Sequence, residues 1–281
     1  MGVGSDDVLS ISFLTFFEGP EPLLFPDVTY SFYSVWADVY RIPYEKVPLD
    51  EDFRIRPEDY IGRPASGIIF ANPNAPTGIA LALADVERIT AANRDKVVIV
   101  DEAYVDFGGE SAVSLLDRYD NLLVVQTFSK SRSGAGLRIG YAMGSAEMIR
   151  CMNDIKFSIN SYTMNRPAIL AGCAVMDNET YYAGCVRRIV ETRERAKKEL
   201  AALGFVFPDA KTNFILARHE KMPAKEIFTR LREKKIFVRY FGSKRIEEYL
   251  RITIGTDAEM DALFAALREI LSGAPDGEKH D

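Results

Sequence analysis

The sequence predicts an α/β fold in which a mainly parallel sheet dominates the first part of the chain. Short apolar runs bounded by turn residues are typical of buried strands, and four of them occur at residues 67–71, 96–101, 121–126 and 137–142. Residues 83–93, between the first two runs, have the apolar period of a helix. Because strand, helix and strand alternate, we expect parallel strands joined by crossovers.

The second part of the chain has a different pattern. A helical stretch rich in Arg, Glu, Lys and Ala covers residues 165–203. It is followed by strand patterns at 213–218, 236–241 and 249–255 and by helix patterns at 224–235 and 258–273. This arrangement is typical of a smaller α+β domain. We place the boundary near Met176, which gives a large domain of residues 1–176 and a small domain of residues 177–281.

The composition narrows the functional classes. The chain has 281 residues, of which 47% are hydrophobic and 27% charged, as in ordinary globular proteins. Its formal net charge of −6 disfavours nucleic acid as a partner. Three cysteines without a CxxC pair, and only two histidines, do not provide a structural metal site, so we expect no metal. With no signal-peptide pattern and no uncharged apolar run of about 18 residues, we expect a soluble cytoplasmic protein without a membrane partner.

Two candidate site residues follow neighbouring strands of the predicted sheet. Asp101 ends the run 96–101, and Lys130 comes shortly after the run 121–126. The carboxyl ends of strands are where α/β sheets bind ligands. Taken alone, Asp101 is more readily interpreted as a helix cap or a surface acid. A lysine that forms a Schiff base must lie near a carbonyl and be partly deprotonated by burial or by positive neighbours.

Lys130 is surrounded by residues that bind anions. Phosphate sites use hydroxyl groups, backbone N–H groups and a guanidinium fork, and the nearby candidates are Thr127, Ser129, Ser131, Arg132, Ser133 and Arg138. A dinucleotide loop does not explain this segment, because its glycines do not fit GxGxxG and it leads into a strand. An SxxK acyl-enzyme motif does not either, because Thr127 stands in the serine position and no KTG follows.

The segment ANPNAPTG at residues 71–78 forms a sharp turn after a strand. It is either a simple connection or a loop whose Asn side chain contacts a ligand. Combined with the two other segments it predicts a cofactor site. Pyridoxal phosphate chemistry needs an amine for the aldehyde, an acid at the pyridine nitrogen and an anchored phosphate. Lys130, Asp101 and Arg138 are candidates for these three roles, in that order.

These residues resemble the fold-type I aminotransferases and, among them, most closely the histidinol-phosphate aminotransferases. The matching stretches are GSDD, FPDVTYSFY, NPNAPTG, VDEAYVDF, TFSKSRSGAGLRIGY, TNFILAR and YLRITIGT, in family order from residue 4 to residue 256. The resemblance implies a large domain of the fold-type I class with a smaller C-terminal domain. It also implies pyridoxal 5'-phosphate as cofactor, amino acid and keto acid substrates, and a homodimer.

The resemblance also implies roles for single residues. Lys130 bonds the cofactor and then moves the proton at the substrate α-carbon, while Asp101 pairs with the pyridine nitrogen. Ser5 and Asp6 contribute at a helix start, where free N–H groups favour an anion. Asn74 is assigned because Ala75 stands where many relatives have Asn. The remaining cofactor contacts would come from Tyr30, which stacks on the ring, from Tyr104, which bonds the phenolic oxygen, and from Thr127, Ser129 and Arg138, which bind the phosphate.

For the substrate, the resemblance implies that Arg251 grips a carboxylate and that Asn213 and Arg239 make weaker contacts. An alternative for Arg251 is a surface charge on an edge strand, because it alternates with the apolar Leu250 and Ile252. The implied reaction is amino transfer between histidinol phosphate (or imidazole acetol phosphate) and 2-oxoglutarate (or glutamate), in histidine biosynthesis. An amino acid O-phosphate decarboxylase and an aromatic or broad-specificity aminotransferase remain alternatives.

Relatives are expected to carry an N-terminal arm before the GSDD stretch, which covers the active site and supports the dimer. In this sequence residues 4–7 lead directly into a predicted helix over residues 8–19. Without the arm we expect apolar side chains of this helix, such as Phe13, Phe16 and Phe17, to be exposed. A further alternative is therefore a fragment that binds the cofactor but is catalytically impaired.

Overall fold

A seven-stranded sheet forms the centre of the large domain. The computed structural model describes residues 1–273, and its strand order in this sheet is β1-β7-β6-β5-β4-β2-β3. Strands β2 to β6 run parallel, whereas β7 is antiparallel to both β6 and β1. The strands are β1 (Gly2–Val3), β2 (Leu23–Pro26), β3 (Tyr44–Val47), β4 (Gly67–Ala71), β5 (Val97–Asp101), β6 (Leu122–Thr127) and β7 (Ile139–Met143).

The four strands predicted in this domain correspond to β4, β5, β6 and β7. The predicted parallel pairing is confirmed from β4 to β6, and the helix between β4 and β5 is α3 (Leu83–Ala92). The sheet is mainly parallel as predicted, and β7 is a strand that departs from this by pairing antiparallel with β6. The physical reason is that only a short 3-10 turn, η4 (Ala135–Leu137), lies between these strands, so the chain returns without a crossover helix.

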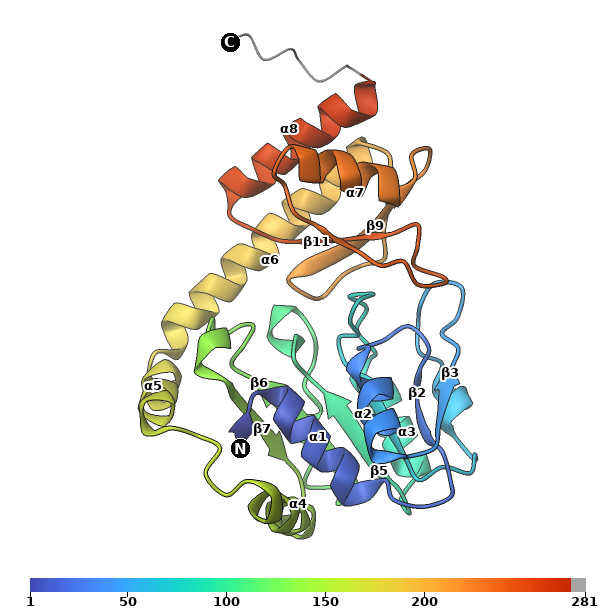
Figure 1. The fold of residues 1–281 in the computed structure, drawn as a ribbon, viewed down its shortest axis with the longest axis vertical. Helices are drawn as coiled ribbons and strands as arrows, with labels where there is room; N and C mark the ends of the chain where they lie inside the picture. Colours follow the sequence, from blue (N-terminus) through green and yellow to red (C-terminus); the bar gives the residue numbers. More distant parts are fainter. Residues whose placement is uncertain (274–281) are drawn as a thin grey trace.

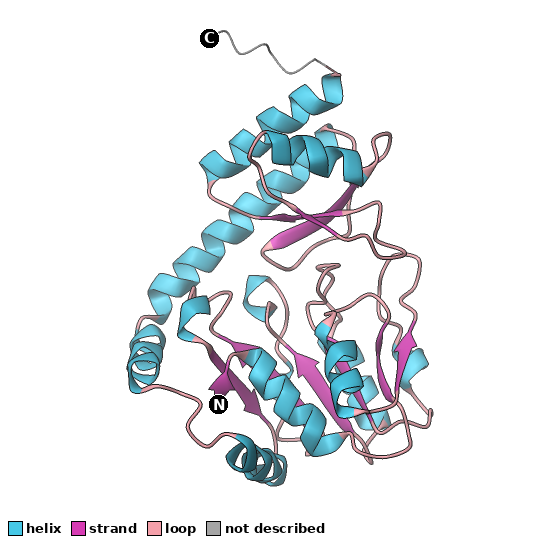
Figure 2. Ribbon diagram, in the orientation of Figure 1, coloured by secondary structure: helices cyan, strands magenta, loops and turns pink. Residues whose placement is uncertain are grey.

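Helices cover both faces of this sheet (Figures 1 and 2). One face packs against α1 (Ser5–Phe16), α2 (Phe32–Tyr40) and α4 (Ala146–Ile159), and the other packs against α3. The side chains of β5 show the alternation, because Ile99 enters the first core while Val98 and Val100 enter the second. Each of these buried side chains stabilises the fold by about 1.5–3 kcal/mol.

The first helix differs from its prediction in two ways. It begins at Ser5 rather than at residue 8, and its N-cap is Gly4 without a side-chain hydrogen bond. The expected exposure of its aromatic residues is wrong for Phe13 and Phe17, which have no accessible surface, while Phe16 is half-buried. Phe13 packs edge-to-face on both Phe17 and Trp36, at ring-centroid distances of 5.4 and 5.6 Å. Helix α2, which the sequence pattern did not predict, therefore covers this surface.

The small domain contains a four-stranded antiparallel sheet in the order β10-β11-β9-β8. Its helices α7 and α8 and the second half of α6 share one core with this sheet. The elements are α6 (Glu179–Ala202), β8 (Phe205–Val206), β9 (Phe214–His219), α7 (Ala224–Glu233), β10 (Arg239–Tyr240), β11 (Leu250–Thr253) and α8 (Asp257–Ser272). Strand β10 is shorter than the predicted range 236–241.

The long helical stretch predicted over residues 165–203 is two helices. Helix α5 (Arg166–Asp177) ends at Asn178, and α6 begins at the next residue. Val175 of α5 packs with Phe128 and Ile139 of the large domain, whereas Leu200 of α6 belongs to the small-domain core. In Figure 1, α6 runs from the level of the large sheet up to the small domain. Among residues 1–273, no helix is long and apolar enough to cross a membrane.

Candidate active site

A cavity of about 180 Å³ lies at the carboxyl ends of β4, β5 and β6. The start of α1 and the segment between β6 and β7 close it from the other side. This is the edge of a parallel sheet at which ligands usually bind. The residues that line the cavity are Ser5, Asp6, Tyr30, Ala71, Ala75, Asp101, Ala103, Tyr104, Ser129, Lys130, Ala135 and Arg138.

Asp101 is the buried acid of this cavity. It is the last residue of β5 and only 5% exposed. The Tyr33 hydroxyl donates a hydrogen bond to Asp101 Oδ2 at 2.9 Å, and the Ala103 N–H donates to Oδ1 at 3.3 Å. Burial raises the pKa of Asp101 to about 6, although both hydrogen bonds act in the opposite direction. A cationic group placed beside this carboxylate would favour its charged form.

Lys130 lies three residues after the end of β6 and is exposed toward the cavity. Its Nζ is 5.3 Å from the centroid of the Tyr104 ring. That ring packs edge-to-face on Phe214 of the small domain, at a centroid distance of 5.1 Å. The amine and the acid that were predicted from separate strand ends thus line one cavity. Tyr104 is the aromatic neighbour of the amine.

The third part of the site is a cradle for an anion. Arg138 has a left-handed backbone (φ 53°), and its guanidinium donates to the carbonyl oxygens of Ala135 at 3.2 Å and Val3 at 3.3 Å. These contacts place it beside the first turn of α1, where backbone N–H groups are free. A Cβ at Gly140 would overlap the backbone of Gly4, so glycine is what allows β7 to lie against this helix start.

Ser129 and Thr127 contribute to this cradle differently. Ser129 lines the cavity, whereas Thr127 is buried behind it and is not part of the wall. The Thr127 hydroxyl accepts the Ser129 N–H at 3.1 Å and lies 3.0 Å from Ser129 Oγ. In this geometry Thr127 orients Ser129.

Tyr30 and Asp6 form the wall between the helix start and the acid. The Tyr30 hydroxyl donates to Asp6 Oδ1 at 2.9 Å, and burial together with this carboxylate raises the pKa of Tyr30. The Tyr30 ring also packs on Trp36 at a centroid distance of 6.1 Å. The aromatic ring expected to stack on a cofactor is therefore held in place by contacts on two sides.

Asn74 is placed differently from its expected role. Its amide N–H groups donate to Val28 O at 2.9 Å and to Thr77 Oγ1 at 3.1 Å, and its oxygen accepts the Thr29 hydroxyl at 2.8 Å. The residue of this turn that lines the cavity is Ala75. Because its donors and its acceptor have partners in segment 28–29 and at Thr77, Asn74 ties this segment to the turn and is not part of the cavity wall.

The proposed substrate residues lie on the small domain, outside the cavity wall. Arg251 is on β11, an interior strand between β10 and β9, so the edge-strand alternative is wrong. Its guanidinium carbon lies 5.0 Å from the Phe214 ring, which in turn contacts Tyr104. Arg251 Nε is buried and has no hydrogen-bond partner within residues 1–273. A buried donor without a partner is costly, so an anionic ligand would suit it.

Arg239 lies next to Arg251, whereas Asn213 lies three residues further along the sheet, opposite Ile254. Arg239 pairs with Arg251 across β10 and β11, and both guanidinium groups lie on the ring of Phe241, at 5.5 and 5.8 Å. Asn213 precedes β9, and its carbonyl accepts the Ile254 N–H at 2.9 Å. The structure thus brings two of the three predicted residues, both arginines, onto one aromatic side chain.

Sequence reasoning missed Tyr33. It is fully buried in α2, and its hydroxyl is the side-chain partner of Asp101. The one available signal was a tyrosine among apolar residues, because a buried phenol normally needs a hydrogen-bond partner. That signal indicates a partner without identifying it.

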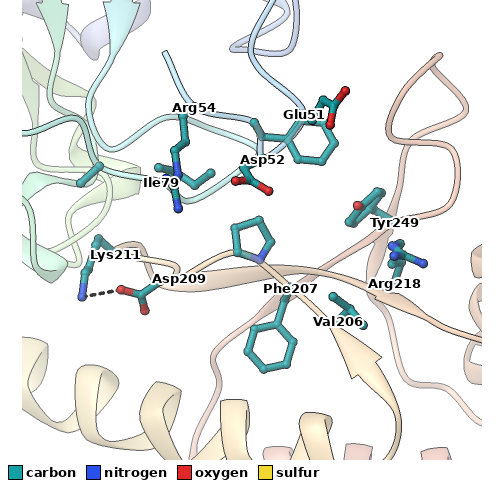
Figure 3. Close-up of a pocket in the computed structure, with 13 residues that line it drawn as sticks. Glu51, Asp52, Arg54, Ile79, Val206, Phe207, Asp209, Lys211, Arg218 and Tyr249 are labelled. Atoms are coloured by element: carbon teal, nitrogen blue, oxygen red, sulfur yellow. Dashed lines mark ion pairs between the residues drawn. The ribbon is translucent and has the colours of Figure 1, made fainter. Parts of the chain in front are cut away.

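A larger cleft of about 580 Å³ lies elsewhere, between the two domains. Figure 3 shows Asp52 and Arg54 of the large domain on one side of this cleft and, on the other, Asp209 and Lys211 of the small domain, which form an ion pair at 3.0 Å. Its walls contain neither Lys130 nor Asp101, and its charged groups are of both signs. We therefore assign the active site to the smaller cavity, where an amine, a buried acid and an anion cradle meet.

These groups fit pyridoxal phosphate. The amine of Lys130 suits an aldehyde, the buried carboxylate of Asp101 suits a protonated ring nitrogen, and Arg138 with the start of α1 suits a phosphate. The fit rests on the donor and acceptor types that line one cavity.

Known proteins with similar sequences are aminotransferases, which agrees with the residue types that line the cavity. Residues 1–267 match the family described as aminotransferase class I and II. A histidinol-phosphate aminotransferase of Lactococcus lactis subsp. cremoris (strain MG1363) is 51% identical over 271 residues, which cover 96% of this chain and 76% of the relative. Histidinol-phosphate aminotransferase 1 of Bordetella parapertussis is 52% identical over 275 residues, covering 97% and 77%.

Solved structures share the fold. The histidinol-phosphate aminotransferase of Sinorhizobium meliloti in complex with pyridoxal-5'-phosphate has a TM-score of 0.86 at 26% identity, covering 96% of this chain and 76% of that one. The L-threonine-O-3-phosphate decarboxylase of Porphyromonas gingivalis has a TM-score of 0.81 at 22% identity, covering 96% and 82%. At that identity the second similarity concerns the fold alone.

Proposed function

The chain belongs to the class I and II aminotransferase family, and we propose that it transfers an amino group between histidinol phosphate and 2-oxoglutarate. In the opposite direction the substrates are imidazole acetol phosphate and glutamate. The observation that carries the proposal is the meeting of Lys130, Asp101 and Arg138 in one cavity, whose residue Tyr104 packs on Phe214 next to Arg251 of the small domain. The relatives at about half identity are named for this reaction.

Pyridoxal phosphate, when bound, supplies an aldehyde that exchanges amines and a ring that accepts the electron pair of the substrate α-carbon. The chain's own residues divide the remaining work. Lys130 is the amine that would hold the aldehyde, and the same amine could take up or return a proton at the substrate α-carbon. Asp101 in its charged form would favour a protonated ring nitrogen. Ser129, Arg138 and the first turn of α1 would hold the phosphate, and Tyr30 and Tyr104 would orient the ring.

The small-domain arginines bind the anionic groups of both substrates. One substrate carries a phosphate and the other carries carboxylates, and both groups accept a guanidinium fork. The Nε of Arg251, buried without a partner among the described residues, is the donor that such an anion would satisfy. Arg239 lies opposite Arg251 on the neighbouring strand, and it and Asn213 would contact the same ligand.

The experiment that tests this proposal uses purified protein and pyridoxal phosphate. We expect the absorbance band of a lysine-bound cofactor in the parent and its absence in Lys130→Ala. With the cofactor loaded, histidinol phosphate and 2-oxoglutarate should yield glutamate. Release of carbon dioxide from an amino acid phosphate, without a keto acid product, would instead identify a decarboxylase. Cofactor binding without any turnover would identify an impaired protein.

We further propose that the protein works in the cytoplasm as a homodimer of two-domain protomers, with residues 1–176 and 177–281 as the domains. Large apolar side chains are exposed on and between α4, α5 and α6, and a second copy would cover them. They are Phe157, Ile159, Tyr162, Ile169, Leu170, Met176 and Tyr181. Light scattering during size-exclusion chromatography should give twice the chain mass, and a monomer mass would refute the dimer.

A further inference from the structure

Arg245 connects the small domain to the large domain. It lies in segment 242–249, which joins β10 to β11. Its Nη1 is 2.6 Å from Asp27 Oδ2, and its Nη2 donates to the carbonyl oxygens of Leu49 at 3.1 Å and Asp50 at 2.8 Å. The Phe53 ring lies 5.3 Å from its guanidinium carbon. All donor and ring contacts of this small-domain side chain are thus with the large domain.

Asp27, the acid that binds Arg245, is also held by backbone contacts that do not involve Arg245. The second oxygen of Asp27 accepts the Leu49 N–H at 3.0 Å, and the Asp27 N–H donates to Val47 O at 2.9 Å. Asp27 also stands three residues before Tyr30, which lines the cofactor cavity. Arg245 therefore binds a carboxylate that is held by the backbone and stands three residues before Tyr30 of the cavity wall.

Apolar side chains surround this contact. Ile246 and Leu216 of the small domain are buried together with Val28, Leu49 and Phe53 of the large domain. Phe53 also meets Tyr249 edge-to-face at 5.4 Å, and both rings line the larger cleft shown in Figure 3. The two domains are thus in contact around Arg245, and the larger cleft lies next to this contact.

A second arginine crosses the domain boundary near α6. Arg193 Nη1 donates to Phe107 O of the large domain at 2.7 Å and to Thr212 O of the small domain at 3.0 Å. The side chain of Arg193 is 3% exposed, whereas that of Arg245 is 30% exposed. Water can replace the partners of Arg245 but not those of Arg193. The Arg193 contact therefore suits a permanent connection between the domains, and the Arg245 contact suits one that can break and re-form.

Segment 242–249 also lies between the two strands that carry the proposed substrate arginines. It begins directly after Phe241, whose ring contacts Arg239 and Arg251, and it ends just before Leu250, the first residue of β11. Arg245 has a left-handed backbone, with φ 75°, which is unfavourable for a residue with a side chain and is kept here by the contacts of that side chain. The contacts of Arg245 therefore hold the segment that connects the two strands on which Arg239 and Arg251 lie.

We propose that Arg245 is a positioning residue which, by binding Asp27, holds the small domain over the cofactor cavity and places Arg251 for substrate. This inference rests on the proposed function only for its consequence in catalysis. The contact itself is a property of the fold. When the contact is broken, a smaller fraction of the protein is competent to bind substrate, and the apparent substrate affinity falls by that fraction.

The test is the variant Arg245→Lys, which keeps the charge but loses the fork that reaches Asp27 and two carbonyl groups. We expect the KM for histidinol phosphate to rise roughly tenfold, as for the loss of one hydrogen bond to a charged group. The kcat and the dissociation constant of pyridoxal phosphate should not change. The control is Arg268→Lys, because Arg268 pairs with Glu199 at 2.6 Å within the small domain. It should change none of the three quantities.

Asp27→Asn should raise KM as Arg245→Lys does, and the double variant should add nothing further. Effects that add, or an unchanged KM in Arg245→Lys, would overturn the proposal. Amide hydrogen exchange of residues 242–249 provides a readout that needs no activity. It should be faster in Arg245→Lys than in the parent, with exchange in α8 unchanged. Equal exchange in both proteins would refute the contact, whereas faster exchange in a protein without turnover would refute only the proposed function.

Discussion

The cofactor half of the site and its substrate half are built in different ways. In the cofactor half, Asp101, Tyr30 and Arg138 each have hydrogen-bond partners within the large domain. In the substrate half, Arg251 Nε is buried without a partner in the described chain, and the Arg251 guanidinium is supported by aromatic rings. One half is organised before a ligand arrives, and the other keeps a donor available.

This difference follows from where the two halves sit. The cofactor residues lie at strand ends of one sheet, so the hydrogen bonds of β4, β5 and β6 fix their spacing. The arginines lie on another sheet, whose distance from the first depends on a few contacts between the domains. Binding energy from the substrate can therefore be used to bring the arginines into place.

Replacing the acid should have the largest effect on the cofactor half. Asp101→Asn removes the negative charge that holds a proton on the ring nitrogen, and we expect kcat to fall by roughly 100-fold to 1000-fold, as for the loss of one electrostatic stabiliser. Steady-state kinetics on the loaded enzyme measure this. Glu102→Gln is the control, because Glu102 is equally buried but accepts hydrogen bonds from Ser111, Ala112 and Gln126 away from the cavity. A similar loss of kcat in both variants would contradict the assignment.

The same acid should make stability depend on pH in the cofactor-free protein. Its pKa rises from 3.8 to about 6 on folding, so the native state binds the proton more tightly than the unfolded chain. The stability contributed by Asp101 is therefore complete below pH 4 and is lost as the pH rises to 6, by at most about 3 kcal/mol. Urea unfolding at pH 4 and pH 7 should show this loss in the parent relative to Asp101→Asn. An identical pH dependence in both proteins would exclude it.

In the substrate half, Arg251→Lys should lower kcat/KM by roughly 30-fold, or about 2 kcal/mol, because a lysine cannot make the forked contact with an anion. The dissociation constant of pyridoxal phosphate should stay the same, since Arg251 does not line the cofactor cavity. Arg218→Lys, in the wall of the larger cleft, is the control and should have no effect. Weaker cofactor binding in Arg251→Lys would mean that the two halves are not separate.

The smallest effect is expected from Tyr33→Phe, which removes the hydroxyl that bonds Asp101. The pKa of Asp101 should rise further, because this hydrogen bond lowers it. Stability at pH 7 should fall by about 1.5 kcal/mol and by less at pH 4, where the carboxyl group is neutral. The control is Tyr60→Phe, because the buried Tyr60 hydroxyl has no hydrogen-bond partner in the described part of the chain and its removal should cost little. Equal losses in both variants would contradict the role of Tyr33.

The sequence by itself predicted the strands that carry the cofactor site. Strands β4, β5 and β6 are continuous apolar runs, and each ends in a segment whose residue types suit one part of a single ligand. Lys130 and Asp101 could be placed in one cavity because neighbouring parallel strands end at the same edge. These features are local, and local features can be read from spacing and residue type.

Tertiary structure decided the rest. That α2 covers Phe13 and that Tyr33 bonds Asp101 depends on which helix packs on which face. Asn74 is engaged by Val28 and Thr29 because the fold brings them next to it from a distant part of the chain. Arg245 reaches Asp27 across more than two hundred residues. The physical reason is the same in each case: the partner of a polar side chain is set by the packing of elements that are remote in sequence, and residue type alone does not specify it.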